Sequence, residues 1–450
     1  MRRDLTQGNI TKSMLLFALP MIAGNLLQQF YNIADTWVVG HFLGKNPLAA
    51  VGSAYTLMTF LTSILIGLCM GSGALFSILF GEKDSGRLRH YAAQAFCVIG
   101  AVTVVLCIAV FVWIDPVLSL LNVPAEVYQM LRDYLWVIFM GIPVVFLYNF
   151  FACLLRAVGD SSTPLVFLGI SAVLNIVLDV LLVAVWPMGV AGAAVATVIA
   201  QAVSGIGIAA YTFLRRPELR ITFGDLCPDR SALREIIRFS FLTCIQQSVM
   251  NFGILLVQGL VNTFGTTVMA AFAAAVKIDS FAYMPAQDFG NAFSTFVAQN
   301  YGAGQKERIR RGSRCAFLLS AAFCLLISAA VFVLAEPLMQ LFVSAQEAEV
   351  IRIGAQYLRI EGAFYVGIGL LFLLYGYYRA VRKPGMSLIL TLISLGLRVA
   401  LAYILAPFIG ETGIWLSVPI GWAVADMAGL LYLFFCSRRQ ASEQLDRKAE

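Results

Sequence analysis

The sequence predicts an all-α integral membrane protein with twelve transmembrane helices, arranged as two homologous six-helix lobes. Three observations lead to this fold class. Hydrophobic residues make up 60% of the chain and charged residues only 12%, whereas soluble domains contain about 25% charged residues. The apolar residues form runs long enough to cross a bilayer. The second half of the chain repeats the first, so we expect the lobes to be related by a pseudo-two-fold axis along the membrane normal.

The predicted helices are apolar segments separated by glycine, proline and charged residues. The second and eighth segments are longer than a bilayer requires, so we expect tilt or extension beyond the membrane. The twelve spans are 13–40, 47–80, 91–114, 127–154, 163–186, 189–214, 233–262, 267–300, 315–335, 350–378, 386–408 and 412–436.

Positive charge is concentrated on one side of the predicted membrane. Of the 31 Lys and Arg residues, the opposite side carries only Lys45, Arg132, Arg352 and Arg359. Lys and Arg are enriched in cytoplasmic loops, so we expect both termini in the cytoplasm and a multi-pass protein of the cell (inner) membrane. This asymmetry also explains the net charge of +6 without a nucleic-acid partner.

An internal repeat connects the two halves of the chain. LAAVGSA at 48–54 aligns with MAAFAAA at 269–275, an offset of 221 residues. The same offset aligns FGEKDSGRLRH at 80–90 with YGAGQKERIRR at 301–311. Since each half has an even number of helices, both halves insert in the same orientation. Transporters built this way bind substrate between the halves and alternate access by rocking them.

The repeat divides the chain into three parts. We expect an N-terminal six-helix lobe at 1–214, a polar cytoplasmic linker at 215–232, and a C-terminal six-helix lobe with a short cytoplasmic tail at 233–450. The sequence contains no HExxH, GxSxG or GxxxxGK[ST] motif, so it predicts neither a familiar hydrolase nor an ATP-driven pump. A secondary active transporter fits better than an enzyme.

The segment 13–40 combines membrane-spanning length with a stripe of polar side chains. Tyr31 lies one turn before the only acid of this stripe, and Pro20 interrupts the helix and predicts a kink. A carboxylate at the bilayer centre costs about 2.5–3.5 kcal/mol on insertion scales. The alternative to a functional acid is a packing Asp bonded to a neighbouring helix. The stripe consists of Asn25, Gln28, Gln29, Asn32 and Asp35.

Two further predicted helices carry polar pairs one turn apart. Asn175 and Asp179 share a face of helix 163–186, and Thr197 and Gln201 share a face of the next helix. With Asp35 they could surround one small cavity with the oxygen ligands that suit a hard cation, while a proton needs only the carboxylates. Ordinary interhelical hydrogen bonds, worth about 0.6 kcal/mol each, explain the Thr and Gln adequately. They do not explain two Asp residues on different helices.

Several motifs resemble the MATE family of multidrug and toxic-compound extrusion antiporters. The resemblance covers essentially the whole chain and is closest to the DinF-like prokaryotic branch. It implies two six-helix lobes around a central cleft, with export of organic, often cationic or amphipathic compounds driven by H⁺ or Na⁺ influx. The motifs are the Pro20–Tyr31–Asp35 spacing, ADTWVVGHFLG (34–44), FGEKDSGRLRH (80–90), LRAVGDSSTP (155–164) and LNIVLD (174–179).

The resemblance assigns roles to particular residues. Asp35 and Asp179 would be the coupling acids, and Pro20 would be the hinge of the first helix. Tyr31, Asn175 and Thr197 would belong to the same ion-coupling network. If Na⁺ is the coupling ion, its ligands would be Asp35, Asn175, Asp179 and Thr197.

The C-terminal lobe departs from NorM-type members of the family. Its first helix carries Gln246 and Gln247 at the centre, where those members carry a Glu. Asp288 and Glu361 remain as candidate acids of this lobe, and Asp279 could pair with a neighbour or line the cleft. Met side chains adapt to varied apolar ligands, although each is more often plain core. The predicted substrate cleft is lined by Gln28, Asn32, Gln201, Met284 and Asp288.

Other functions remain open at this point. A flippase for a lipid-linked precursor belongs to the same superfamily, although such flippases tend to have a more basic cavity. A membrane-embedded enzyme or an ion channel fits the sequence less well. We expect no cofactor besides the transported H⁺ or Na⁺, between which the sequence does not choose. The expected partners are a drug-like small molecule and the lipid bilayer, and we expect a monomer.

Overall fold

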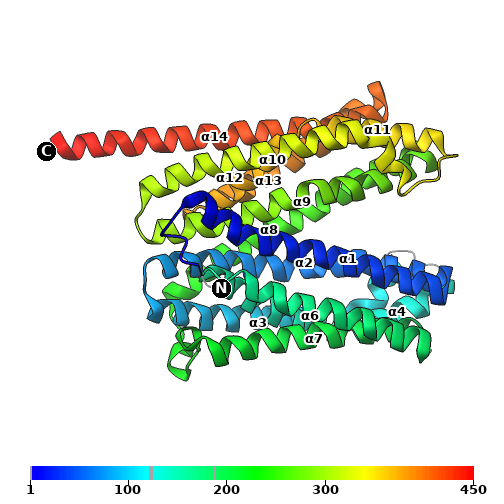
Figure 1. Ribbon diagram of the computed structural model, residues 1–450, viewed down its shortest axis with the longest axis horizontal. Helices are drawn as coiled ribbons and strands as arrows, with labels where there is room; N and C mark the ends of the chain where they lie inside the picture. Colours follow the sequence, from blue (N-terminus) through cyan, green and yellow to red (C-terminus); the bar gives the residue numbers. More distant parts are fainter. Residues whose placement is uncertain (1–2, 121–124, 187, 450) are drawn as a thin grey trace. The chain divides into compact units, whose positions relative to one another are not determined.

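The computed structural model describes residues 3–120, 125–186 and 188–449, and within these residues every regular element is helical (Figure 1). Ten helices of this part of the chain are long and apolar enough to cross a membrane, and two bent pairs raise the number to twelve. This confirms an all-α membrane protein with ten to twelve candidate spans. The α-helices are α1 (Ile10–Leu43), α2 (Lys45–Gly81), α3 (Ser85–Leu120), α4 (Ala125–Met140), α5 (Ile142–Ala157), α6 (Ser162–Asp179), α7 (Gly189–Arg215), α8 (Arg230–Val261), α9 (Thr266–Gly302), α10 (Lys306–Gln340), α11 (Ala348–Gly362), α12 (Tyr365–Ala380), α13 (Pro384–Ile409) and α14 (Glu411–Ala449).

Two of the predicted continuous helices were wrong in detail, because the structure breaks them. The span predicted at 127–154 is α4 and α5, bent by 44°. Pro143 is the second residue of α5 and has no N–H with which to continue the hydrogen bonds of α4. The span predicted at 350–378 is α11 and α12, bent by 52° where Ala363 and Phe364 separate them.

The span predicted at 163–186 changes its helix type part-way. It is α-helical as α6 up to Asp179 and continues as a π-helical segment, η1 (Val180–Val185). π-Helical turns are rare and occur frequently at functional sites. No sequence pattern predicted this segment, which starts directly after a predicted coupling acid.

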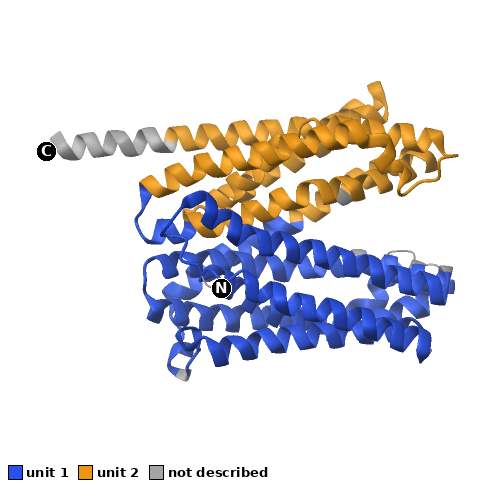
Figure 2. Ribbon diagram, viewed as in Figure 1, with its two compact units in different colours: residues 1–248, 298–306 blue, residues 249–297, 307–450 orange. Residues whose placement is uncertain are grey.

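The described chain divides into two compact units (Figure 2). Unit 1 comprises residues 1–248 and 298–306, and unit 2 comprises residues 249–297 and 307–450. Each unit is a set of residues that pack against one another, whereas the predicted lobes and linker were inferred from the internal sequence repeat. The lobes and the linker therefore remain a prediction. Position 450 of the predicted tail lies outside the described residues.

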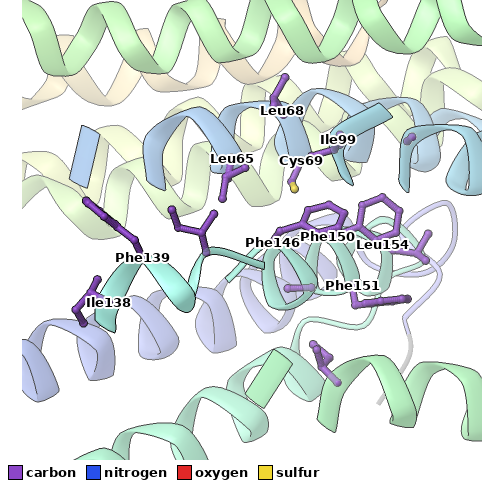
Figure 3. Packing of buried hydrophobic residues seen from close by; sticks show 14 of the residues in the cluster. Leu65, Leu68, Cys69, Ile99, Ile138, Phe139, Phe146, Phe150, Phe151 and Leu154 are labelled. Carbon is purple, nitrogen blue, oxygen red and sulfur yellow. The ribbon is translucent and has the colours of Figure 1, made fainter. Parts of the chain in front are cut away.

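Aromatic side chains form the centre of the core of unit 1 (Figure 3). The Phe150 ring on α5 lies edge-on to Phe76 of α2 at 6.0 Å and to Phe96 of α3 at 5.2 Å. Phe146 and Phe151 extend the cluster along α5. Aromatic pairs of this geometry add about 0.5–1.5 kcal/mol beyond their burial, so the cluster holds the second half of the broken α4–α5 span against α2 and α3.

The predicted linker contains two short 3₁₀ turns, η2 (Pro217–Leu219) and η3 (Phe223–Leu226), and contacts α3. The Asp225 carboxylate accepts hydrogen bonds from the backbone N–H and hydroxyl of Thr222. These bonds hold the pKa of Asp225 below its ordinary value. Gln94 of α3 donates to the Cys227 carbonyl at 2.7 Å, so the linker is anchored to unit 1.

The segment before α1 is built into unit 1. Leu5 is fully buried, and its backbone N–H donates to Gln299 Oε1 at 3.1 Å. Gln299 in turn donates to the Ala157 carbonyl at 2.7 Å, and Asn300 donates to the Leu5 carbonyl at 3.2 Å. Gln299 therefore joins the end of α9 both to the N-terminal segment and to the end of α5.

Two glycines allow the ends of α2 and α9 to touch. A Cβ added to Gly302 would lie 1.9 Å from the Ile78 carbonyl oxygen, and one added to Gly81 would lie 2.0 Å from the Gln299 carbonyl oxygen. Both neighbours are backbone atoms, which cannot rotate away as a side-chain end could. Only glycine fits at either position without separating the helix ends.

We expect Gly302→Ala to destabilise the protein by about 1–3 kcal/mol, the usual cost of overpacking. The measurement is the thermal midpoint of the purified protein in detergent. Gly396→Ala on α13 is the matched control, since a Cβ there meets nothing within 4 Å and Ala favours a helix. Equal midpoints for the two variants would contradict the close approach.

Candidate functional site

Unit 1 brings the two predicted coupling acids together. Asp35 on α1 is half-buried, and Asp179 at the end of α6 is fully buried. Their carboxyl groups interact electrostatically with each other. α1 and α6 approach closely because Gly24 faces Leu168 across the contact and Gly169 faces Leu27. The packing of small residues against large ones positions the acids.

The carboxyl pair has open hydrogen-bonding capacity. Asp35 Oδ1 and both oxygens of Asp179 are buried without a donor in the part of the chain that the structure describes. Neither acid forms an ion pair with a Lys, Arg or His of that part. Two adjacent carboxylates repel each other and cannot both stay ionised without compensation. The pair therefore needs either a proton or a cation.

Asn175 and Thr197 form a hydrogen bond between α6 and α7, one turn from Asp179. Asn175 lies one turn before Asp179 on α6 and is 2% exposed. Its Nδ2 donates to Thr197 Oγ1 on α7 at 3.3 Å, and the Thr197 hydroxyl donates to the Ala193 carbonyl at 3.0 Å. Asn175 Oδ1 is buried and has no donor among the described residues. It therefore adds an amide oxygen to the carboxylate oxygens.

Two tyrosines border the acids, and sequence reasoning found only one of them. Tyr31 is hydrogen-bonded to Gln28 and interacts electrostatically with Asp35. Tyr134 on α4 is buried and interacts with Asp35, Asp179 and Tyr31. Aromatic residues are common throughout this chain, so an isolated Tyr on a different helix carried no sequence signal.

The other predicted cleft residues are more dispersed. On α1, Asn32 Nδ2 donates to Gln29 Oε1 at 3.4 Å, and Gln28 is exposed. Gln201 on α7 is half-buried, and its Oε1 lies 3.1 Å from where a Cβ on Gly141 would be. It thus packs against the α4–α5 break and not against the acids.

Met284 and Asp288 lie on α9 in unit 2, whereas Asp35 and Asp179 belong to unit 1. Met284 is half-buried and Asp288 is buried. Pro20 lies inside α1, which continues through it from Ile10 to Leu43. The hinge role of Pro20 remains a prediction.

The donor set could hold a hard monovalent cation as well as a proton. Carboxylate, amide and hydroxyl oxygens of Asp35, Asp179, Asn175 and Thr197 are the ligand types that hard cations take. No group of three or more His, Cys, Asp or Glu side chains in the described residues could hold a metal ion. Any transported Na⁺ would thus depend on amide and hydroxyl oxygens in addition to the two acids.

Comparison with known proteins identifies the family. The MatE family model matches residues 20–181 and 241–404, which include both acids and most of both halves. The chain belongs to the MatE family. It is therefore a multi-pass membrane transporter and not an enzyme.

Relatives of this MatE-family chain match along nearly its whole length. "Probable multidrug resistance protein YpnP" of Bacillus subtilis is 29% identical over 95% of this chain and 96% of its own length. "Probable multidrug resistance protein NorM" of Thermotoga maritima is 28% identical over 95% of this chain and 92% of its own. A crystal structure of MATE in the bent conformation has a TM-score of 0.91 at 24% identity, over 99% of this chain and 98% of that chain, and confirms the fold.

We expect Thr197→Val to destabilise the protein more than Thr212→Val does. Both threonines are buried on α7, and both donate to the carbonyl four residues earlier. Only Thr197 also accepts from another helix, so its replacement leaves the buried Asn175 amide without an acceptor, at a cost of about 1–3 kcal/mol. The thermal midpoint in detergent measures the difference, and equal losses would show that the Asn175–Thr197 bond does not contribute.

Proposed function

We propose that this MatE-family transporter is a cation-coupled multidrug efflux antiporter. It exports organic, often cationic or amphipathic compounds by alternating access, in exchange for H⁺ or Na⁺. The observation that carries the proposal is that Asp35 and Asp179 interact inside a membrane-spanning helix bundle, with buried oxygens that lack a hydrogen-bond partner among the described residues. Relatives described as multidrug resistance proteins support a broad, drug-like substrate range.

The coupling step follows from the electrostatics of the pair. When a proton or Na⁺ occupies the site, it compensates the negative charge, and the two carboxyls share it. When the ion leaves, Asp35 and Asp179 face each other as carboxylates and attract a cationic substrate or a new ion. Asn175 and Thr197 hold α6 to α7 throughout, so α1 is the element that can respond. The ion and the substrate therefore compete to compensate the same negative charge of Asp35 and Asp179. This competition is the basis of exchange.

The membrane arrangement is part of the proposal. Both termini lie in the cytoplasm of a cell whose inner membrane holds the chain, because the Lys and Arg residues gather on that side. The protein works as a monomer, and the similarity of its motifs to the DinF-like branch supports membership of that branch. Labelling of single introduced cysteines by a membrane-impermeant reagent in whole cells tests the orientation.

Dye efflux from everted vesicles tests the function, with proton and sodium gradients imposed separately. Efflux driven by only one gradient identifies the coupling ion. Lipid scrambling without dye transport would instead favour a flippase, and conductance without exchange would favour a channel.

We expect Asp35→Asn to reduce coupled efflux to the level of vesicles without the transporter, while expression and insertion stay normal. Asn keeps the size and hydrogen bonding of Asp but cannot carry the titrating charge. Asp179→Asn should give a similar or milder loss, because two interacting acids titrate as a pair. The exposed Asp133, which accepts from Gln129 on the same helix, gives the control variant Asp133→Asn. Wild-type efflux by Asp35→Asn would overturn the assignment.

We expect Pro20→Ala to lower turnover while substrate binding persists. Pro20 leaves the Leu16 carbonyl without its helical hydrogen bond, and the polar stripe from Asn25 to Asp35 lies beyond this weak point. Ala restores the bond and stiffens α1. The measurements are equilibrium dye binding and efflux on the same preparation. Unchanged turnover would show that Pro20 only tolerates a kink and does not act as a hinge.

A further inference from the structure

The contact between the ends of α2 and α9 is made by equivalent positions of the internal repeat. Gly302 of α9 lies against the Ile78 carbonyl, and Gly81 of α2 lies against the Gln299 carbonyl. The repeat offset of 221 residues relates Gly81 to Gly302 and Ile78 to Gln299. Transporters built from two repeated halves alternate access by rocking one half against the other. A contact between equivalent helix ends therefore has to separate when its end of the bundle opens.

The segment before α1 binds one of these two helix ends. Leu5 is fully buried. Its N–H donates to Gln299 Oε1 at 3.1 Å, and its carbonyl accepts from Asn300 Nδ2 at 3.2 Å. The repeat places Ile78 and Leu79 of α2 at the positions of these two amides, and aliphatic side chains form no hydrogen bonds. The end of α9 therefore carries a binding site for Leu5 that the end of α2 does not have.

The same segment is fixed at its start to the turn between α5 and α6. The Arg3 N–H donates to the Gly159 carbonyl at 2.9 Å. Gly159 has a φ of +86°, and a Cβ there would overlap the Arg3 carbonyl oxygen, so the two backbones are in direct contact. The turn itself is held by the buried Asp160, which accepts from the Thr163 N–H at 3.1 Å and from Arg216 just after α7. Arg3 therefore rests on a part of unit 1 that is well anchored.

The burial of Leu5 depends on the end of α9 staying in place. Asp4 accepts from the Thr6 N–H at 2.9 Å, which closes a turn at Leu5. If the end of α9 moves away, the Leu5 side chain enters water and its backbone loses the two bonds to α9. Exposure of an apolar side chain to water is unfavourable, so Leu5 favours the closed contact. A single leucine gives a modest bias, which the binding of an ion or a substrate can overcome.

We propose that residues 3–6 form a latch, which holds the end of α9 against the ends of α2 and α5 and must release it before this end of the bundle opens. The Arg3–Gly159 contact fixes the latch to the α5–α6 turn, and Leu5 is the part that separates from α9. The proposal rests on the proposed exchange by alternating access, with this end of the bundle facing the cytoplasm. It gives a conformational role to a segment that takes no part in the acid pair.

Hydrogen–deuterium exchange of the purified transporter tests the latch without a transport measurement. Exchange of the backbone amides is followed by mass spectrometry in peptides that cover the ends of α2 and α9. We expect Leu5→Asp to speed exchange at both helix ends by about tenfold or more, because a charge cannot take the buried place of Leu5 and local opening controls exchange. Gln7→Asp is the matched control, since it introduces the same charge at an exposed position and should leave both ends unchanged.

The peptides that respond decide the result. Faster exchange in residues 3–8 alone would show that the segment detaches while the helix ends stay together, and would overturn the proposal, as would equal exchange in Leu5→Asp and the wild type. If Leu5→Asp fails to fold, Leu5→Ala replaces it and should give a smaller increase at the same two ends. Dye efflux is measured on the same preparations. A wild-type protein with the expected exchange pattern but without coupled efflux would contradict the proposed function and not the latch.

Discussion

The cost of an ionised carboxyl group inside a membrane determines how this protein is built. A carboxylate at bilayer depth must face protein, water or a counter-charge. Asp179 is fully buried and has no donor from another described side chain, so it depends on Asp35 and on whatever ion the pair shares. The contacts that hold α1 and α6 together, and the Asn175–Thr197 bond that holds α6 to α7, serve to keep that pair in register. The packing of α1, α6 and α7 therefore has to keep Asp35 and Asp179 close to each other.

Irregular backbone occurs next to the buried acids. The π-helical segment η1 starts directly after Asp179, and the break between α11 and α12 starts directly after Gly362, which follows Glu361. Non-helical backbone at membrane depth is tolerated only where protein or a cavity satisfies its polar groups. Protein groups that surround a buried carboxyl can also provide hydrogen-bond partners for non-helical backbone next to it.

The sequence predicted the fold class, and it proposed the centre of the candidate site, because both depend on local patterns. Hydropathy located the spans, and the i, i+4 spacing placed Asn175 and Asp179 on one face. What it missed depends on contacts between distant segments. Tyr134 belongs to the site only because α4 packs near α1 and α6, and Leu5 is buried only because Gln299 and Asn300 reach it. The π-helical segment and the break at Ala363 have no composition that separates them from their neighbours.

The buried acids of the two units differ in the partners that they already have. In unit 1, Asp35 Oδ1, Asn175 Oδ1 and both oxygens of Asp179 lack donors from the described residues, so several oxygens can converge on a desolvated cation. In unit 2, Tyr365 already donates to Asp279, and Arg398 supplies a fixed positive charge. Hard cations require several oxygen ligands at once, whereas a proton requires one. The oxygens of unit 1 are therefore compatible with H⁺ or Na⁺, and the coupling ion has to be decided at Asp35 and Asp179.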